Sequence, residues 1–558
     1  MRRALLLALS VCVFAGACKR GSSAGGAEGQ GPGPTKVTAT VFVTTELFGT
    51  IEPCGCNSDP RGDLARAAAV IDRARTTGHV LYIDGGSLLF AAEEIPPQQV
   101  TQAKMTADLI RDAVKTQLKA AAIGLGPGDL SLGKTAVTVP RQAANISASA
   151  GIPLAPPEVI DVGKVRVGVF GVVDPDLVAG LGVAATDPAA AAAGAVKTLN
   201  AAGAQVIIAL AHMDRAGARK LATAVAGIDF IVAGQSAPDP KDVSPAPEHA
   251  GDTWIVQPAN RGQGLARIDL TVAGDDGAFA DAIGKARARA EIADLGPRID
   301  ELATRIAGWE KDPTADPAFL DKKRAELAVL EQKRAHLQAS PLAIPDHGNY
   351  FVLTQVPITR QLACDPEVQA AKIALDKNVG KANLEIAKND KPAPAAPGQA
   401  SYVGSDECSY CHAEAVTFWR STRHAHAWET LEEVGKEFSY NCIGCHVTGW
   451  QEPGGSTLAF TDKLRDVQCE VCHGPGSLHV AANGKEKPKS LTRVPPKSRC
   501  MTCHTEDHSD TFQYEAYLRD VTGGGHGQAF RKKLGDGPTG HELRAAKKVT
   551  EVGAGCTQ

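Results

Sequence analysis

Four copies of the pattern Cys-x-x-Cys-His lie in one stretch near the C-terminus, and they constrain the fold more than any other feature of the chain. This spacing is the attachment signature of c-type haem, in which two thiols bond to the haem edge and the adjacent histidine binds the iron. Paired zinc sites are the alternative, but zinc ribbons do not need a histidine after every pair of cysteines. The motifs are Cys408-Ser-Tyr-Cys411-His412, Cys442-Ile-Gly-Cys445-His446, Cys469-Glu-Val-Cys472-His473 and Cys500-Met-Thr-Cys503-His504.

Four haems on about 130 residues leave no room for an ordinary hydrophobic core, so the haem faces themselves must be what the short helices pack against. The predicted proximal ligands are His412, His446, His473 and His504. The candidate distal ligands are His424, His426, His479 and His526, with His508 a weaker candidate. For each of these the alternative is a surface histidine. If one iron lacks a distal histidine, it can bind or reduce small molecules, whereas an iron between two histidines only transfers electrons.

The N-terminus carries an export signal. Arg2 and Arg3 precede an apolar run over residues 4–15 that is too short to span a membrane. Two cleavage sites compete: Ala15-Gly16-Ala17 fits an ordinary site, whereas Gly16-Ala17-Cys18 resembles a lipobox in which Cys18 is lipidated. We favour the lipoprotein, with residues 1–18 as the signal and 19–36 as a flexible tether. This predicts a membrane-tethered protein on the periplasmic side, with redox partners in the periplasm or membrane.

The chain of 558 residues divides into several predicted domains, and its net charge of -4 gives no reason to expect a nucleic-acid partner. In residues 37–275, β-branched runs alternate with Ala-rich helical stretches, which predicts a layered α/β domain. Residues 276–340 predict a helical hairpin that turns at 312–316. The remaining parts are a return strand and helix (341–390), a Pro-rich linker (391–400), a mainly α tetrahaem domain (401–535) and a frayed tail (536–558). Within the α/β domain the expected strands are 37–43, 80–83, 165–173, 206–210 and 230–232, and the expected helices are 64–75, 98–118 and 188–202.

The haem segment resembles the multihaem cytochrome c-554 family over about 130 residues. The resemblance rests on residues 402–412, on Arg423-His-Ala-His426, on Cys445-His-Val-Thr-Gly449 and on residues 469–477, in that order. Members of that family are periplasmic electron carriers whose haems mostly have two histidine ligands, and some have one five-coordinate haem. The resemblance therefore implies haem c as cofactor, with His424 or His426, and His479, as distal ligands.

The first domain resembles secreted metallophosphoesterases of the 5′-nucleotidase type, which implies a four-layered α/β sandwich. The resemblance runs from residue 42 to Pro53, then through Gly62-Asp-Leu-Ala-Arg66, Ile83-Asp-Gly-Gly-Ser87, Gly126-Pro-Gly-Asp129, Ala144-Asn-Ile-Ser147, Ala211-His212 and Ala233-Gly-Gln-Ser236. Such enzymes activate water with two metals held by Asp, Asn and His side chains. The corresponding positions here are Glu46, Phe48, Ser87, Pro127, Gly128, Gln235 and Ala237, and only His212 matches. Two-metal hydrolysis is therefore expected to be lost, with His212 a structural histidine.

Cys54 and Cys56 are the tentative catalytic residues that replace the lost metal site. They follow the first motif directly, at the end of a predicted strand, where active-site loops lie in open α/β sheets. A bridge between them would be strained and therefore reactive, and as thiolates they could instead bind a soft metal. Alternatively they are reduced or structural thiols, one of them paired with Cys364. Some fusions that resemble this chain carry selenocysteine near this position.

Three functions compete. The favoured one is an exported multihaem cytochrome that transfers electrons through four haems and is coupled to a redox or binding site at Cys54 and Cys56. The second is a metal-dependent nucleotidase with a cytochrome attached, and the missing ligands argue against it. The third is a partner-binding scaffold for the cytochrome. Replacing Cys54 and Cys56 would alter turnover in the first case and nothing catalytic in the third.

Overall fold

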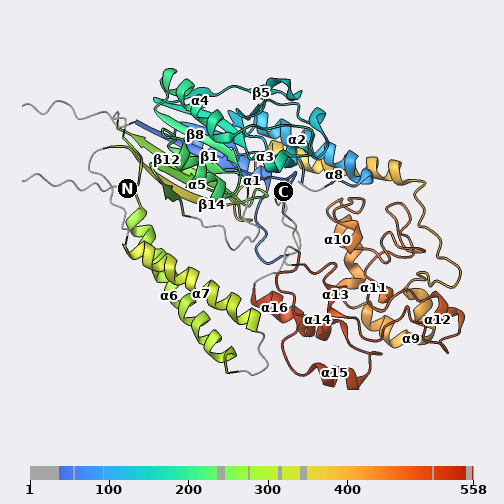
Figure 1. Ribbon diagram of the computed structural model, residues 1–558. Coiled ribbons are helices and arrows are strands. Elements are labelled where there is room, and N and C mark those ends of the chain that lie inside the picture. The colour runs from blue at the N-terminus through green and yellow to red at the C-terminus, as the bar shows by residue number, and fades with distance from the viewer. Residues whose placement is uncertain are drawn as a thin grey trace, which may run out of the picture. The chain divides into compact units, whose positions relative to one another are not determined.

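The computed structural model describes residues 37–53, 57–91, 94–235, 246–273, 277–311, 317–339, 348–505, 508–547 and Cys556 (Figure 1). Several predicted features lie outside the described residues: the signal and tether, Cys54 and Cys56, Ala237 and the turn of the helical hairpin.

Two six-stranded sheets form the α/β domain. The first has the order β13 (Ala280–Asp281), β14 (Tyr350–Pro357), β12 (Gly264–Val272), β1 (Val37–Thr44), β2 (Val80–Asp84), β3 (Ala122–Ile123). The second has the order β10 (Glu248–Ala250), β11 (Thr253–Val256), β9 (Phe230–Ala233), β8 (Val206–His212), β7 (Val165–Val173), β6 (Glu158–Val162). Neighbouring strands β1 and β2, and β7, β8 and β9, run parallel, so their carboxyl ends gather at one edge of each sheet.

The core follows from the alternation of side chains along each strand. Val41 and Val43 of β1 point into the same apolar cluster as Ile208 and Leu210 of β8, so this cluster lies between the sheets. Phe42 points the other way, into a second cluster. Both faces of the central strands are therefore buried, which explains why the sequences of these strands are near-continuous apolar runs.

Helices pack on the outer face of each sheet. Helices α1 (Leu64–Arg75) and α2 (Val100–Thr116) share the cluster that contains Phe42, and Val368 of α8 (Pro366–Ala387) joins it. On the other sheet, α4 (Pro188–Ala201) and α5 (Arg215–Ala224) share a cluster with β7 and β8. The strands and helices predicted from the sequence are confirmed, including a helix over 64–75 and a strand over 165–173 with the predicted bounds.

Helices α6 (Gly284–Trp309) and α7 (Pro317–Ala339) lie side by side, as the hairpin prediction requires (Figure 1). Leu295, Ile299 and Ile306 of α6 are buried. The apolar residues that recur at helical spacing along α6 are thus buried.

The haem-motif segment is mainly helical, with short helices and a small core of its own. Its helices are α9 (Ser405–Trp419), α10 (Ala427–Glu432), α11 (Cys469–His473), α12 (Ser477–Ala481), α13 (Lys497–Cys500), α14 (Tyr514–Val521), α15 (Gln528–Leu534) and α16 (Gly540–Ala546). Trp428, Tyr440 and Ile443 pack with Ala387 at the end of α8, so α8 belongs to the α/β domain at one end and to this core at the other.

Two expectations about the C-terminal part are wrong. The tail was expected to be frayed, but it contains α16, whose first turn is closed by a capping box between Thr539 and Glu542. Cys364 was a possible partner of Cys54 or Cys56, but it forms a disulfide with Cys556 instead. The Cα atoms of that pair are 6.1 Å apart, within the ordinary range for a disulfide.

Candidate haem-binding site

Each Cys-x-x-Cys-His motif lies on or beside a short helical turn. The first motif lies on α9, which kinks at His412, and the third makes up α11. The second contains the 3-10 turn Ile443–Cys445, and the fourth follows directly from α13. Because residues three apart share one side of a helical turn, both cysteines of each motif face the same way.

The structure brings two predicted distal histidines opposite two motif histidines. The rings of His412 and His479 are 6.4 Å apart between centroids, with an interplanar angle of 22°. The rings of His424 and His504 are 6.2 Å apart. The sequence positions of these histidines do not reveal the pairing, since each pair comes from separate helices.

These spacings fit an iron between two imidazoles. A bond between a metal and an imidazole nitrogen is about 2 Å long, so two nitrogens on opposite sides of one metal are about 4 Å apart and their ring centroids about 6 Å apart.

Hydrogen bonds to the chain orient several of these rings. The Nδ1 atom of His473 lies 2.8 Å from the Thr492 carbonyl oxygen, and that of His479 lies 2.6 Å from the Glu486 carbonyl oxygen. The Nδ1 atom of His446 lies 2.5 Å from the Ala427 carbonyl oxygen. An imidazole that donates from Nδ1 to a carbonyl keeps its Nε2 lone pair for a metal, so these rings are held in the ligand tautomer.

Burial favours the neutral form of these imidazoles. It lowers the pKa of His424 and of His446. Burial, with the nearby His424 and Arg544, lowers the pKa of His504 to about 4. Neutral imidazole is the form that binds a metal, so at neutral pH these side chains are ready to act as ligands.

The other predicted distal histidines are placed differently. The side chain of His426 is 58% exposed, with Nδ1 3.2 Å from a Glu429 oxygen and Nε2 3.1 Å from the Arg420 carbonyl oxygen. His526 packs edge-on against Phe418, and burial lowers its pKa, with a smaller contribution from the nearby His473. Among the described residues, no imidazole ring lies opposite that of His446 or that of His473 at the spacing of the two pairs.

All eight motif cysteines and all four motif histidines line one cavity of 2490 Å³. A pocket for one small ligand is about 300–1,000 Å³, so this cavity has room for several large groups. It also reaches the α/β domain, where Glu52 and Asp376 line it, and the C-terminal residue Cys556. The donor atoms, the ring spacings and the volume together fit several covalently attached haems.

The positions whose sequence resembles a two-metal centre, here called the remnant centre, lie at the carboxyl ends of β1, β2 and β8, and protein atoms fill the space between them. The Oγ atom of Ser87 is 3.1 Å from Nε2 of His212, whose Nδ1 is 3.0 Å from the Gly85 carbonyl oxygen. Both side chains are buried, and burial lowers the pKa of His212. The expectation that His212 is a structural histidine with both nitrogens satisfied is confirmed.

A glycine and a carboxylate pack around Ser87 and leave little free space in the remnant centre. A Cβ atom on Gly126 would lie 2.2 Å from Ser87 Oγ, so a larger residue cannot stand there without rearrangement. Asp129 accepts hydrogen bonds from the amides of Ser87 (2.9 Å) and Leu88 (3.1 Å) and pairs with buried Arg141 (3.2 Å). Within the part of the chain that the structure describes, no group of three or more His, Cys, Asp or Glu side chains could hold a metal ion.

Residues on both sides of Cys54-Gly-Cys56 contact the haem-motif segment. Glu52 forms an ion pair with Lys436, and the Ser58 amide donates to Asp510 at 2.9 Å. Sequence reasoning missed Lys436, because a lysine in a polar stretch gives no sign that it will be largely buried against another domain.

Comparisons with known proteins find relatives of the haem-motif segment and solved structures that resemble the chain. Residues 407–474 match the family model of cytochrome c554 and c-prime. Cytochrome c-554 of Nitrosomonas europaea is 30% identical over 136 residues, which cover 19% of this chain and 58% of the relative. The haem-motif segment is thus similar to the cytochrome c-554 family, as its motifs predict, and the match supports covalently bound haem c. The chain spans little more than half the length of this relative.

Solved structures similar to this chain are nucleotidases. A 5′-nucleotidase precursor from Thermus thermophilus has a TM-score of 0.41 and 20% identity, and the match covers 64% of this chain and 61% of that chain. A putative 5′-nucleotidase from Staphylococcus aureus in complex with alpha-ketoglutarate has a TM-score of 0.39 and 13% identity, covering 77% and 71%.

A search of the described helices for one that could span a membrane finds none with the required length and apolar character.

Proposed function

We propose that this chain is an exported c-type cytochrome that passes electrons through four covalently attached haems. The observation that carries the proposal is the pair of ring spacings, 6.4 Å for His412 and His479 and 6.2 Å for His424 and His504, inside a segment with four attachment motifs. Haem iron bound by two histidines cycles between two oxidation states without binding substrate, which is the chemistry of an electron carrier.

The ligand assignment follows from these placements. His412 pairs with His479, His504 with His424, and His473 with His526. His446 has no partner imidazole among the described residues, so its iron is the open one and is where a small molecule would bind. His426 is not a ligand, because its two ring nitrogens are engaged by Glu429 and Arg420.

In this proposal the motif cysteines hold the haems, and backbone carbonyl groups orient the histidine ligands. The cysteines fix the haem edges covalently, while Thr492, Glu486 and Ala427 use their carbonyl oxygens to set the tautomers of His473, His479 and His446. Because the motifs share one cavity, the haems would lie close to one another. Close packing is what electron transfer along a chain of haems requires.

For the α/β domain we propose a four-layered sandwich that has lost hydrolysis and instead carries a redox or binding site at Cys54 and Cys56, coupled to the haems. The support is that Glu52 and Ser58, which flank these cysteines, contact Lys436 and Asp510. A hydrolytic role has no support from the remnant centre, where Ser87 and His212 bond to each other in place of metal ligands.

Export and membrane tethering through Cys18 are part of the same proposal, with redox partners in the periplasm or membrane. Their support is the N-terminal signal and the need to attach haem outside the cytoplasm.

Elemental analysis of protein matured with a haem-attachment system tests the proposal. Four irons per chain and no manganese or zinc are expected. Two additional metals per chain would support the alternative function of a metal-dependent nucleotidase. Fewer than four irons would refute the assignment of four haems. The Cys54→Ser/Cys56→Ser variant tests whether these cysteines are coupled to the haems. It should keep four irons but lose electron exchange with small thiol or disulfide compounds. Unchanged exchange would refute the proposed thiol site.

A further inference from the structure

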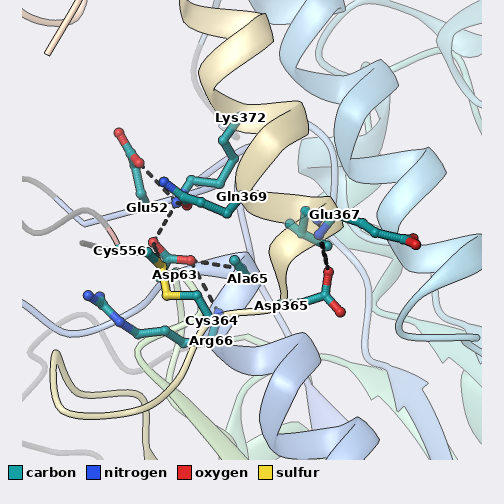
Figure 2. The surroundings of a disulfide bond; sticks show 11 residues. Glu52, Asp63, Ala65, Arg66, Cys364, Asp365, Glu367, Gln369, Lys372 and Cys556 are labelled. Atoms are coloured by element: carbon teal, nitrogen blue, oxygen red, sulfur yellow. Dashed lines mark hydrogen bonds and ion pairs between the residues drawn. A yellow bond between two sulfur atoms is a disulfide. The ribbon is translucent and has the colours of Figure 1, made fainter. Parts of the chain in front are cut away.

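The Cys364–Cys556 disulfide has no role in the function described so far. It joins the residue before the N-cap of α8 to a residue near the end of the chain, across a separation of 192 positions (Figure 2). Since the haem-motif segment lies between these two cysteines, the disulfide closes the whole segment into a covalent loop on the α/β domain.

Cationic side chains surround this disulfide. Figure 2 shows Lys372 above it and Arg66 below it. Lys372 is 1% exposed, and its Nζ lies 2.5 Å from Asp63 and 3.0 Å from Glu52. The Cys556 sulfur is 3.9 Å from the same Asp63 oxygen. The sulfurs therefore lie between this network of charges and the apolar cluster that contains Phe42, against which both cysteines pack.

The disulfide also lies at the N-termini of two helices. Cys364 precedes Asp365, the N-cap of α8, and Cys556 lies beside Asp63, the N-cap of α1. Helix N-termini and nearby cations stabilise a thiolate relative to a thiol. The Asp63 carboxylate opposes this effect, but its charge is offset by Lys372 and by the amides of Ala65 and Arg66. Stabilising the reduced form makes a disulfide easier to reduce.

A continuous row of charged groups leads from this disulfide to the second haem motif. Glu52 pairs with Lys372 on one side and with Lys436 on the other. Glu52 and Lys436 line the same cavity as Cys442 of that motif. Cys556 itself lines the cavity that contains the haem motifs.

We propose that the Cys364–Cys556 disulfide is a redox-active site that accepts electrons from the haems, an inference that rests on the haem function proposed above. The bond between the two sulfurs would break on taking up two electrons, one from each of two reduced haems, which would be oxidised by one electron each. The products would be two thiolates, and each that is not held by the surrounding cations would take up a proton from water. The reaction runs in reverse when the haems are reoxidised by their partner.

Coulometric titration through one-electron mediators tests this site directly. Two proteins are compared, Cys54→Ser/Cys56→Ser and the same protein with Cys364→Ser/Cys556→Ser in addition, so that the first cysteine pair cannot contribute. The protein that keeps the disulfide is expected to take up two electrons more than the other, while the haem absorbance change is the same in both. Equal electron uptake would show that the disulfide is only a structural cross-link.

Chemical trapping of free thiols in the unmutated protein tests the same proposal and does not depend on whether a variant folds. The haems are poised fully reduced or fully oxidised, the protein is alkylated with iodoacetamide, and peptides are analysed by mass spectrometry. Alkylation of Cys364 and Cys556 only in the reduced sample is expected. Absence of alkylation with all haems reduced would overturn the redox site, whereas a protein with no haem absorbance would refute the cytochrome function itself.

Discussion

The imidazole rings of His412 and His479 face each other at an interplanar angle of 22° with their centroids 6.4 Å apart. His412 ends an attachment motif on α9 and His479 lies on α12, so the pair forms only when the chain folds. A haem attached to Cys408 and Cys411 would thereby have an imidazole on each side.

Replacing His479 with alanine should convert one haem from low-spin to high-spin, because the iron bound by His412 loses its second strong ligand. Electron paramagnetic resonance of the oxidised protein should show a new high-spin signal that accounts for one haem per chain. The matched control is His426→Ala, which removes a histidine whose ring nitrogens are already engaged by Glu429 and Arg420. If His426→Ala produces the high-spin signal and His479→Ala does not, the assignment of the two histidines is reversed.

Carbon monoxide should bind to one of the four ferrous haems in the unmodified protein, because the proposed ligand assignment gives His526 to the iron of His473 and leaves the iron of His446 without a second imidazole. Optical titration should give a bound fraction of about a quarter of the haem. Replacing Cys442 and Cys445 with alanine, which prevents attachment of that haem, should abolish binding, whereas Cys469→Ala/Cys472→Ala should not. Binding that survives loss of the second motif would place the open iron elsewhere.

The attachment motifs and the strands of the α/β domain could be predicted from the sequence because both depend on local patterns. A haem-binding turn needs two cysteines and a histidine at fixed spacing, and β7 is free of polar side chains apart from Arg166, as expected of a strand buried on both faces. Helix α16 also has a local signal, the capping box at Thr539 and Glu542, although the polar, Gly-rich composition of the tail led to the opposite prediction.

The pairings could not be predicted because they depend on tertiary placement. Nothing local distinguishes His424, which faces His504, from His426, which faces solvent two residues later. Cys364 could have joined several cysteines, and its partner lies 192 positions away. Lys372 is buried only because Asp63 and Glu52 come to it from another part of the chain. Long-range contacts of this kind leave no periodic trace in the sequence.

Removing the hydroxyl of Ser87 should destabilise the α/β domain by about 1–3 kcal/mol, the cost of leaving buried polar groups unpaired. Its Oγ bonds to His212 and accepts from the Gly128 amide at 3.2 Å, so Ser87→Ala leaves both without a partner. Urea unfolding, followed by hydrogen exchange in β2, gives the free energy of unfolding. Ser149→Ala, at an exposed serine, should change it by less than about 0.5 kcal/mol. Equal effects of the two substitutions would mean that the remnant centre contributes nothing to stability.

The contribution of Asp84 to the stability of the α/β domain should fall as pH rises from about 4 to about 7. Burial raises the pKa of Asp84 to about 7, against hydrogen bonds from Thr44 and the Gly86 amide that lower it. A carboxyl group with a raised pKa in the folded state keeps a proton that the unfolded chain has already lost in this pH range. Folding therefore takes up a proton there, and the free energy of unfolding decreases by about 1.4 kcal/mol for each unit of pKa difference.

Asp84→Asn should flatten this dependence, since the variant has no proton to lose at that position. The measurement is the free energy of unfolding at a series of pH values, again followed in β2. Asp229, whose pKa burial raises to about 6, contributes a fall of the same sign in both proteins, so the difference between the two slopes reports Asp84 alone. Asp72→Asn, at an exposed position on α1, should leave the wild-type slope unchanged. A slope that is equal in wild type and Asp84→Asn would mean that Asp84 is ionised in the folded protein throughout this range.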